Sequence, residues 1–116
     1  MKEIQPGQVL YEYPNKEGNV AVLAFWCLAC NCEHPYRVIS GGHGEPVWDW
    51  NGDLMKPTFS PSLLVYNRGT GSGTACHLFV REGKIEYCSD CPHVLAGKTV
   101  PMVPLDPVRR EWIYPE

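Results

Sequence analysis

The sequence predicts a mainly β fold: a small single-domain antiparallel sheet with a zinc-knuckle or ribbon-like metal site and one short helix. Three observations lead to this prediction. Eleven glycines and 11 prolines among 116 residues interrupt the chain too often for long helices. Short apolar runs of strand length are separated by turn residues. Cysteines and histidines occur in pairs whose spacing is typical of zinc ligands.

The composition limits the classes of function. Hydrophobic residues make up 44% of the chain and charged residues 20%, as in folded globular proteins. We expect a single zinc-binding β domain over residues 1–116, with a C-terminal tail over residues 106–116. The net charge of −3 gives no general attraction to nucleic acid. Without a signal peptide or an apolar run near the roughly 18 residues of a membrane span, a cytoplasmic location in a host cell is expected.

The strands follow from the apolar runs and the turns between them. Strands are expected over residues 8–13, 20–26, 36–40, 58–66 and, interrupted by prolines, 99–105. The run over residues 20–26 is continuously apolar, which predicts a central strand covered on both faces. Residues 48–53 look like an aromatic strand end entering a turn, and residues 67–73 predict a flexible loop.

A hairpin around the turn Glu82-Gly83 is the most specific local prediction. With Arg81 paired to Lys84, His77 lies opposite Cys88. The same register predicts the apolar pairs Val80 with Ile85 and Leu78 with Tyr87. The potential ligands near both strand ends therefore gather at one end of the hairpin. A slip of one residue would exchange the faces, so the choice between Cys76 and His77 stays open.

A short helix is expected after the hairpin. Pro92 suits the first helical position, Asp90 or Cys91 the cap, and Gly97 the end. The partial positive charge of a helix N-terminus would favour a thiolate at Cys91.

The cysteine spacing predicts a Zn²⁺ site. The expected ligands are Cys27, Cys30, Cys76 and Cys91, with His34, His77 and His93 as alternates. Two thiolates in a C-x-x-C turn converge on one point, and a distant pair can complete the tetrahedron. Cys32 and Cys88 are expected to be small buried hydrophobic residues.

Two interpretations of the histidines are open. In the first, His34, His77 and His93 orient ligands around a closed structural metal. In the second, they leave a metal position open, and Asp90 or Glu33 acts as base on a metal-bound water. A Gly-x-Ser-x-Gly turn and a His-Glu-x-x-His motif are missing from the sequence. Around Ser60 and Ser62 no catalytic triad is evident.

A second group of residues could recognise a partner. Trp48 and Trp50, with Asn51 and Asp53, could form a surface for a protein. The alternative is that the aromatic side chains simply help to fill the core of a small β domain.

Several motifs together resemble a known family. They are Phe25-Trp-Cys-Leu-Ala-Cys30 with His34, Trp50-Asn-Gly-Asp53, Lys56-Pro-Thr-Phe-Ser-Pro-Ser-Leu63, Cys76-His77 and Asp90-Cys91-Pro-His93. Over residues 23–105 the chain is similar to small proteins common in phage and prophage genomes, catalogued as a domain of unknown function and sometimes labelled ammonia monooxygenase. Members have proline and glycine inside the C-x-x-C knuckle, where this chain has Leu28 and Ala29. Related genes lie near bacterial ubiquitin-like conjugation genes. The resemblance implies a metal site and a mobile-element setting.

Two classes of function follow. In the first, zinc stabilises a phage-type module that binds a host or phage protein and catalyses nothing. In the second, the protein is a zinc-dependent hydrolase that uses His34, His77, His93 and Asp90 around an open metal position. The thiolate-rich ligand set favours the binding module, because thiolates reduce the Lewis acidity of zinc.

Overall fold

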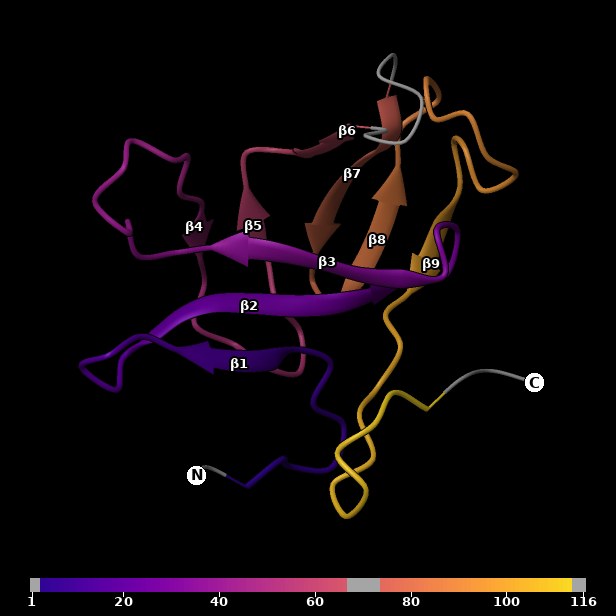
Figure 1. The fold of residues 1–116 in the computed structure, drawn as a ribbon. Coiled ribbons are helices and arrows are strands. Elements are labelled where there is room, and N and C mark those ends of the chain that lie inside the picture. Colours follow the sequence, from indigo (N-terminus) through magenta and orange to yellow (C-terminus); the bar gives the residue numbers. More distant parts are fainter. Residues whose placement is uncertain (1–2, 67–73, 114–116) are drawn as a thin grey trace.

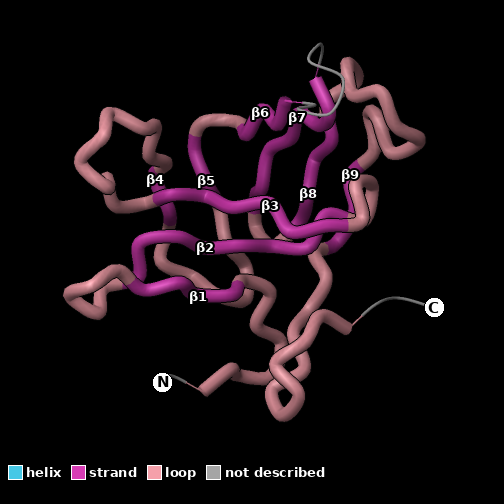
Figure 2. Tube along the Cα trace, in the orientation of Figure 1, coloured by secondary structure: helices cyan, strands magenta, loops and turns pink. Residues whose placement is uncertain are grey.

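A computed structural model describes residues 3–66 and 74–113 of the protein. Within these ranges the chain forms nine β-strands joined by turns (Figures 1 and 2). They are β1 (Tyr11–Pro14), β2 (Val20–Cys27), β3 (Cys32–Arg37), β4 (Asp49–Trp50), β5 (Phe59–Ser60), β6 (Leu63–Tyr66), β7 (Thr74–Arg81), β8 (Lys84–Tyr87) and β9 (Thr99–Pro101).

The strands form three antiparallel sheets, ordered β1-β2-β3, β4-β5 and β6-β7-β8-β9. In Figure 1, β2 and β3 run across the front of β7 and β8, so the two larger sheets cross each other. One cluster of buried side chains joins them, with Phe25 and Tyr36 from the first sheet and Leu78 and Ile85 from the other. The prediction of a small, mainly β, antiparallel fold is confirmed.

The predicted hairpin is present with its predicted register. Arg81 pairs with Lys84, and the two apolar pairs that depend on this register, at positions 80/85 and 78/87, are both formed. Glu82 and Gly83 in the turn have φ values of 50° and 76°, in the left-handed region that such tight turns use. The backbone N–H of Cys88 donates to the carbonyl of His77 at 2.9 Å, which extends the pairing to the end of the hairpin.

The predicted helix after Cys91 is wrong: the described residues contain no helix. The backbone N–H groups of this segment bond locally or back to the sheet instead of four residues back. The N–H of Leu95 donates to the His93 side chain at 3.2 Å, and that of Gly97 donates to the carbonyl of Tyr87 at 3.1 Å. The hydrogen bond to the His93 side chain and the bonds to β8 therefore take the place of the i→i−4 hydrogen bonds that a helix would need.

Several strand boundaries differ from those expected. The expected strand over residues 58–66 divides into β5 and β6 around Pro61, and the last strand ends at Pro101. The strand expected over residues 36–40 lies earlier in the chain, as β3 (Cys32–Arg37). The strand expected over residues 8–13 begins later, as β1 (Tyr11–Pro14). The turn after β4 is confirmed, whereas the loop expected over residues 67–73 and the end of the tail, residues 114–116, lie outside the described ranges.

The two cysteines expected to be buried are not: Cys32 is exposed and Cys88 is half-buried. Cys32 is the first residue of edge strand β3, and Cys88 comes just after the end of β8. A search of residues 3–66 and 74–113 finds no helix capable of spanning a membrane.

Candidate functional site

Alternation along β7 sends two neighbouring side chains to opposite faces of its sheet. Cys76 is fully buried and His77 is half-buried. Successive residues of a strand point to opposite faces, so these two side chains cannot belong to the same site. We call the face that carries Cys76 and Leu78 the inner face and the one that carries His77 and Phe79 the outer face. The pair Asp90 and Cys91 is divided in the same way, with Asp90 exposed and Cys91 buried.

A group of four potential metal ligands lies at the inner face. The ligand atoms of Cys27, Cys30, His34 and Cys76 all lie within 4.8 Å of one another. Cys27 ends β2, Cys30 lies in the turn that follows, and His34 lies in β3. The positive φ of Asn31, 56°, helps to close this turn, and the N–H of Cys30 points at the Cys27 sulfur at 3.4 Å. The structure thus brings together three of the predicted ligands and the alternate His34.

The fourth predicted ligand, Cys91, lies in a second group that shares Cys76. Its members are Cys76, Cys91 and the alternate His93, and the Cys76 sulfur lies 3.4 Å from His93 Nε2. The Cys91 thiol also bonds to the backbone of His77: it donates to the carbonyl at 3.0 Å and its sulfur accepts from the N–H at 3.2 Å. Cys91 therefore fixes the strand position from which His77 projects.

The thiols of the inner group are electrostatically coupled. A hydrogen bond from Cys76 chiefly lowers the pKa of Cys27, against the effect of burial, and contacts from His34 and Tyr87 lower it further. The same bond, together with burial and the charge on Cys27, raises the pKa of Cys76. Burial and the Cys27 charge also raise the pKa of Cys30. Charge on one of these sulfurs thus opposes the ionisation of its neighbours, and a bound cation would let several of them ionise together.

The chemistry of this group fits a metal ion. All six cysteines are free thiols, so none of them is held in a disulfide. His34 is 4% exposed, and within the described part of the chain its Nε2 atom is buried without a hydrogen-bond partner. Buried polar atoms are nearly always paired, so an unpaired nitrogen on a histidine that lies among thiols is consistent with a role as metal ligand. Sulfur and imidazole donors in a four-membered set suit Zn²⁺.

Three residues on the outer face have the arrangement of a catalytic triad. The Ser62 hydroxyl lies 3.1 Å from His77 Nε2, and His77 Nδ1 lies 3.2 Å from both carboxylate oxygens of Asp90. The carboxylate favours the tautomer with its proton on Nδ1, which leaves Nε2 to accept from the serine. The expectation that Ser62 lacks such partners is wrong. We call these three residues the Ser-His-Asp triplet.

The sequence contains a signal that could have located this triplet. The register of β6 and β7 pairs Leu64 with His77, so Ser62 lies diagonally across from His77 on the outer face. An antiparallel pairing between the expected strand over residues 58–66 and the hairpin would have placed the two together. Ser62 and Asp90 belong to two separate motifs of the family resemblance that lie far apart in the sequence, so their proximity depends on the pairing of strands.

The three histidines proposed for a hydrolytic metal site are separated. His34 belongs to the inner group, His93 to the group of Cys76 and Cys91, and His77 to a third group with Cys88 and Asp90. His34 lies in β3, His77 on the outer face of β7, and His93 in the segment between β8 and β9, which accounts for this separation.

The four predicted partner-binding residues lie around the small β4-β5 sheet. Trp48 and Trp50 are half-buried and pack against the core. The side chain of Asn51 donates to the Lys56 carbonyl at 3.1 Å, and that of Asp53 accepts from the N–H groups of Met55 and Lys56. These two polar residues therefore shape the turn between β4 and β5.

A groove beside β6 adjoins the triplet. Its volume is 420 Å³, and its walls include Pro35, Trp48 and three consecutive residues, 63–65, that follow Ser62. The indole N–H of Trp48 donates to the carbonyl of Ser62 at 3.2 Å, which ties the groove wall to the triplet. β6 is an edge strand, and Leu64 lies opposite His77. The N–H and carbonyl of His77 bond to Cys91 and Cys88, so Leu64 and His77 form a non-hydrogen-bonded pair, and the N–H and carbonyl of Leu64 point away from β7.

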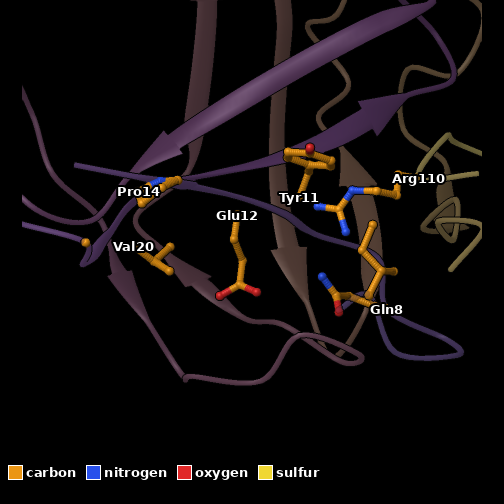
Figure 3. Close-up of a pocket in the computed structure, with 8 residues that line it drawn as sticks. Gln8, Tyr11, Glu12, Pro14, Val20 and Arg110 are labelled. Atoms are coloured by element: carbon orange, nitrogen blue, oxygen red, sulfur yellow. The ribbon is translucent and has the colours of Figure 1, made fainter. Parts of the chain in front are cut away.

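A second cavity lies apart from these groups. Its volume is 290 Å³, and Figure 3 shows Gln8, Tyr11, Glu12 and Arg110 around it. The Arg110 guanidinium lies 5.6 Å from the centre of the Tyr11 ring. The cavity lies between β1 and the C-terminal segment, and its lining includes no residue of the Ser-His-Asp triplet or of the cysteine groups.

Comparison with known protein families gives a match over most of the chain. Residues 1–88 match the model of a family described as "Bacterial ubiquitination-like system serine protease (BubE)". Ser62 and His77 lie within the matched residues, and Asp90 lies just beyond them. No curated protein and no solved structure matches the chain. The predicted phage setting stays a prediction. Since the family model covers more than half of the chain, this protein belongs to the BubE family of bacterial ubiquitination-like system serine proteases.

Proposed function

We propose that this protein is a serine protease of a bacterial ubiquitination-like system, with Ser62 as nucleophile, His77 as general base and Asp90 as the residue that orients His77. The observation that carries the proposal is the chain of contacts from Ser62 through His77 to Asp90, at 3.1 and 3.2 Å. The family description names the same class of enzyme.

The proposed reaction uses these three side chains in sequence. Ser62 Oγ attacks the carbonyl carbon of the scissile bond while its proton passes to His77 Nε2. The imidazolium then gives that proton to the leaving group, and the bond to the leaving group breaks. Water, activated by the same nitrogen, hydrolyses the ester on Ser62 and regenerates the hydroxyl. Asp90 stays ionised and stabilises the imidazolium.

We further propose that the groove beside β6 receives the substrate as an extended strand. Apart from Arg37 and Glu45, its walls are formed by apolar residues that would hold apolar side chains, and the Leu64 backbone would pair with the substrate backbone. The protein-binding role expected from the sequence then takes a specific form, in which Trp48 contacts the protein that is cleaved.

A structural Zn²⁺ is the proposed cofactor, held by Cys27, Cys30, His34 and Cys76. When bound it supplies a cross-link between the two crossing sheets, and a closed four-ligand set leaves it no catalytic role. This arrangement is favoured over the zinc-dependent hydrolase because the three histidines which that mechanism needs fall into separate groups.

The test is covalent labelling with a fluorophosphonate, which reacts with activated serines. Ser62 should be labelled in the wild-type protein, as located by peptide mass spectrometry, and Ser62→Ala should abolish labelling. Ser60→Ala is the matched control, because Ser60 is an exposed serine two residues away. Equal labelling of wild-type protein and Ser62→Ala would overturn the proposal.

A further inference from the structure

A third potential ligand lies beside two members of the Ser-His-Asp triplet. The ligand atoms of His77, Cys88 and Asp90 all lie within 4.8 Å of one another. The hydrogen bond from the Cys88 N–H to the His77 carbonyl, 2.9 Å, makes these residues direct neighbours across the hairpin. Direct neighbours project their side chains from the same face. The proposed protease mechanism uses His77 and Asp90 and gives Cys88 no role.

The three side chains offer a nitrogen, a sulfur and an oxygen donor. Three protein ligands with a water in the fourth position form a common open zinc site. The site is reachable from solvent, since the side chains of His77 and Asp90 are 27% and 61% exposed. It differs in this respect from the inner group, in which Cys27 and Cys76 are fully buried.

We propose that Zn²⁺ binds reversibly to His77, Cys88 and Asp90 and thereby inhibits the protease. The site would be occupied in addition to the structural site on the inner face. It makes the outer face sensitive to the concentration of free zinc, and removal of the ion restores activity.

The mechanism of inhibition follows from the two nitrogens of one imidazole. Asp90 faces Nδ1, and Ser62 faces Nε2. An ion between Asp90 and Cys88 takes the lone pair of Nδ1, so the single proton of the neutral ring moves to Nε2. An Nε2–H group donates a hydrogen bond and cannot accept the Ser62 proton. Binding also releases the thiol proton of Cys88 to solvent, as thiolate ligation requires.

Binding and inhibition depend on different premises. Inhibition rests on the proposed protease function, whereas zinc binding rests only on the positions of the three ligands. The experiment therefore measures both.

In the binding experiment, protein that already holds its structural zinc is titrated with Zn²⁺ in a chelator-buffered solution. Wild-type protein should bind one additional ion. Changing even an outer-shell partner of a metal lowers affinity roughly 10–100-fold, so Cys88→Ser should weaken the additional site by at least about tenfold. Cys32→Ser is the matched control, because Cys32 is an exposed cysteine in none of the three ligand groups.

The alternative location is the group of Cys76, Cys91 and His93. An additional ion lost in His93→Ala but retained in Cys88→Ser would place it there and overturn the proposal. Equal affinity in wild-type protein and Cys88→Ser would overturn it as well.

Inhibition is measured in the same samples as the rate of fluorophosphonate labelling of Ser62. This rate should fall as the additional site fills in wild-type protein and Cys32→Ser, and should respond at least about tenfold less sensitively to zinc in Cys88→Ser. A filled site with an unchanged labelling rate would overturn inhibition. A Cys88-dependent site in a protein that the probe never labels would support the metal site and contradict the protease function.

Discussion

At the scale of single residues, Asp90 is the member of the Ser-His-Asp triplet with the greatest exposure, 61% of its side chain. Its two contacts with His77 Nδ1 hold the imidazole in the tautomer that accepts from Ser62. We predict that Asp90→Asn lowers the rate of Ser62 labelling by roughly 10²–10⁴-fold, the usual range for general-base catalysis. Mass spectrometry of samples quenched at successive times measures this rate. Asp106→Asn, in the C-terminal turn, should retain it, and an unchanged rate in Asp90→Asn would exclude this residue from the site.

At the same scale, the buried hydroxyl of Tyr36 is expected to lower the stability of the fold. Its ring stacks on Phe59 with a centroid distance of 3.9 Å, yet its hydroxyl is buried and has no hydrogen-bond partner among the described residues. Removing an unpaired buried hydroxyl relieves its desolvation cost, so Tyr36→Phe should raise the free energy of unfolding by about 1 kcal/mol. Urea denaturation followed by tryptophan fluorescence checks this value. A loss of stability would show that the hydroxyl has a partner.

The same substitution has a pH signature. Burial, with a smaller effect from Cys76, raises the pKa of Tyr36 above the usual value. The unfolded chain would lose this proton near pH 10 while the folded protein keeps it. Above that pH the unfolded state binds fewer protons, so stability is complete below pH 10 and falls as the pH rises further. Tyr36→Phe should reduce the slope of this alkaline decline, measured as Tm against pH.

At the scale of the element, strand β7 separates two kinds of chemistry by its period of two. Cys76 faces the inner group of ligands, and His77 faces Ser62 and Asp90. The hydrogen bonds between the Cys91 thiol and the His77 backbone join the two faces at this point. A metal in the inner group would therefore help to fix the position of His77, the proposed general base.

Two substitutions at adjacent positions test this division. Cys76→Ser should remove the inner metal, lower the Tm and abolish labelling of Ser62, because the strand that holds His77 loses its anchor. His77→Ala should keep the inner metal and change the free energy of unfolding by about 0.5 kcal/mol or less, as is usual for partly exposed positions. It should nevertheless lower labelling by at least about 10²-fold. Metal content, Tm and labelling are measured for both variants, and loss of the inner metal from His77→Ala would contradict the assignment of faces.

At the scale of the whole molecule, the inner group links parts of the chain that are far apart in sequence. Cys27, Cys30 and His34 come from the β2-β3 hairpin, and Cys76 comes from the sheet that crosses it. A single domain of this size has a modest core, and structural zinc contributes about 10 kcal/mol or more to the folding of small metal-dependent domains. With the proposed zinc in the inner group, the molecule is expected to depend on that ion for stability.

We predict that a strong chelator lowers the Tm by more than about 10 °C, since each kcal/mol corresponds to roughly 4 °C or more in a domain of this size. Differential scanning calorimetry with metal analysis checks this prediction, and readdition of Zn²⁺ should restore the Tm. A metal-free protein with an unchanged Tm would show that the core alone suffices.

His34→Ala should lower zinc affinity more than Cys91→Ser, because His34 belongs to the four-membered group.

Local features of this protein were determined by its sequence. The Glu82-Gly83 turn sets the register of its hairpin, because a two-residue loop allows only one pairing of Arg81 with Lys84. The spacing of Cys27 and Cys30 likewise indicates convergent sulfur atoms, since the intervening turn is short. The local sequence around Pro92 does favour a helix start. The helix prediction was wrong because hydrogen bonds to β8 offered the backbone better partners.

Contacts between distant segments were decided only by the tertiary structure. Ser62 lies 15 residues from His77 in the sequence, and Asp90 lies 13 residues beyond it. Their meeting depends on the pairing of β6 with β7 and on the path of the chain after β8. Local sequence carries little information about such pairings, because many registers satisfy the same apolar pattern until a common core selects one of them. The residue types required for catalysis and metal binding were thus visible in the sequence, whereas their division between two faces of one sheet arose from folding.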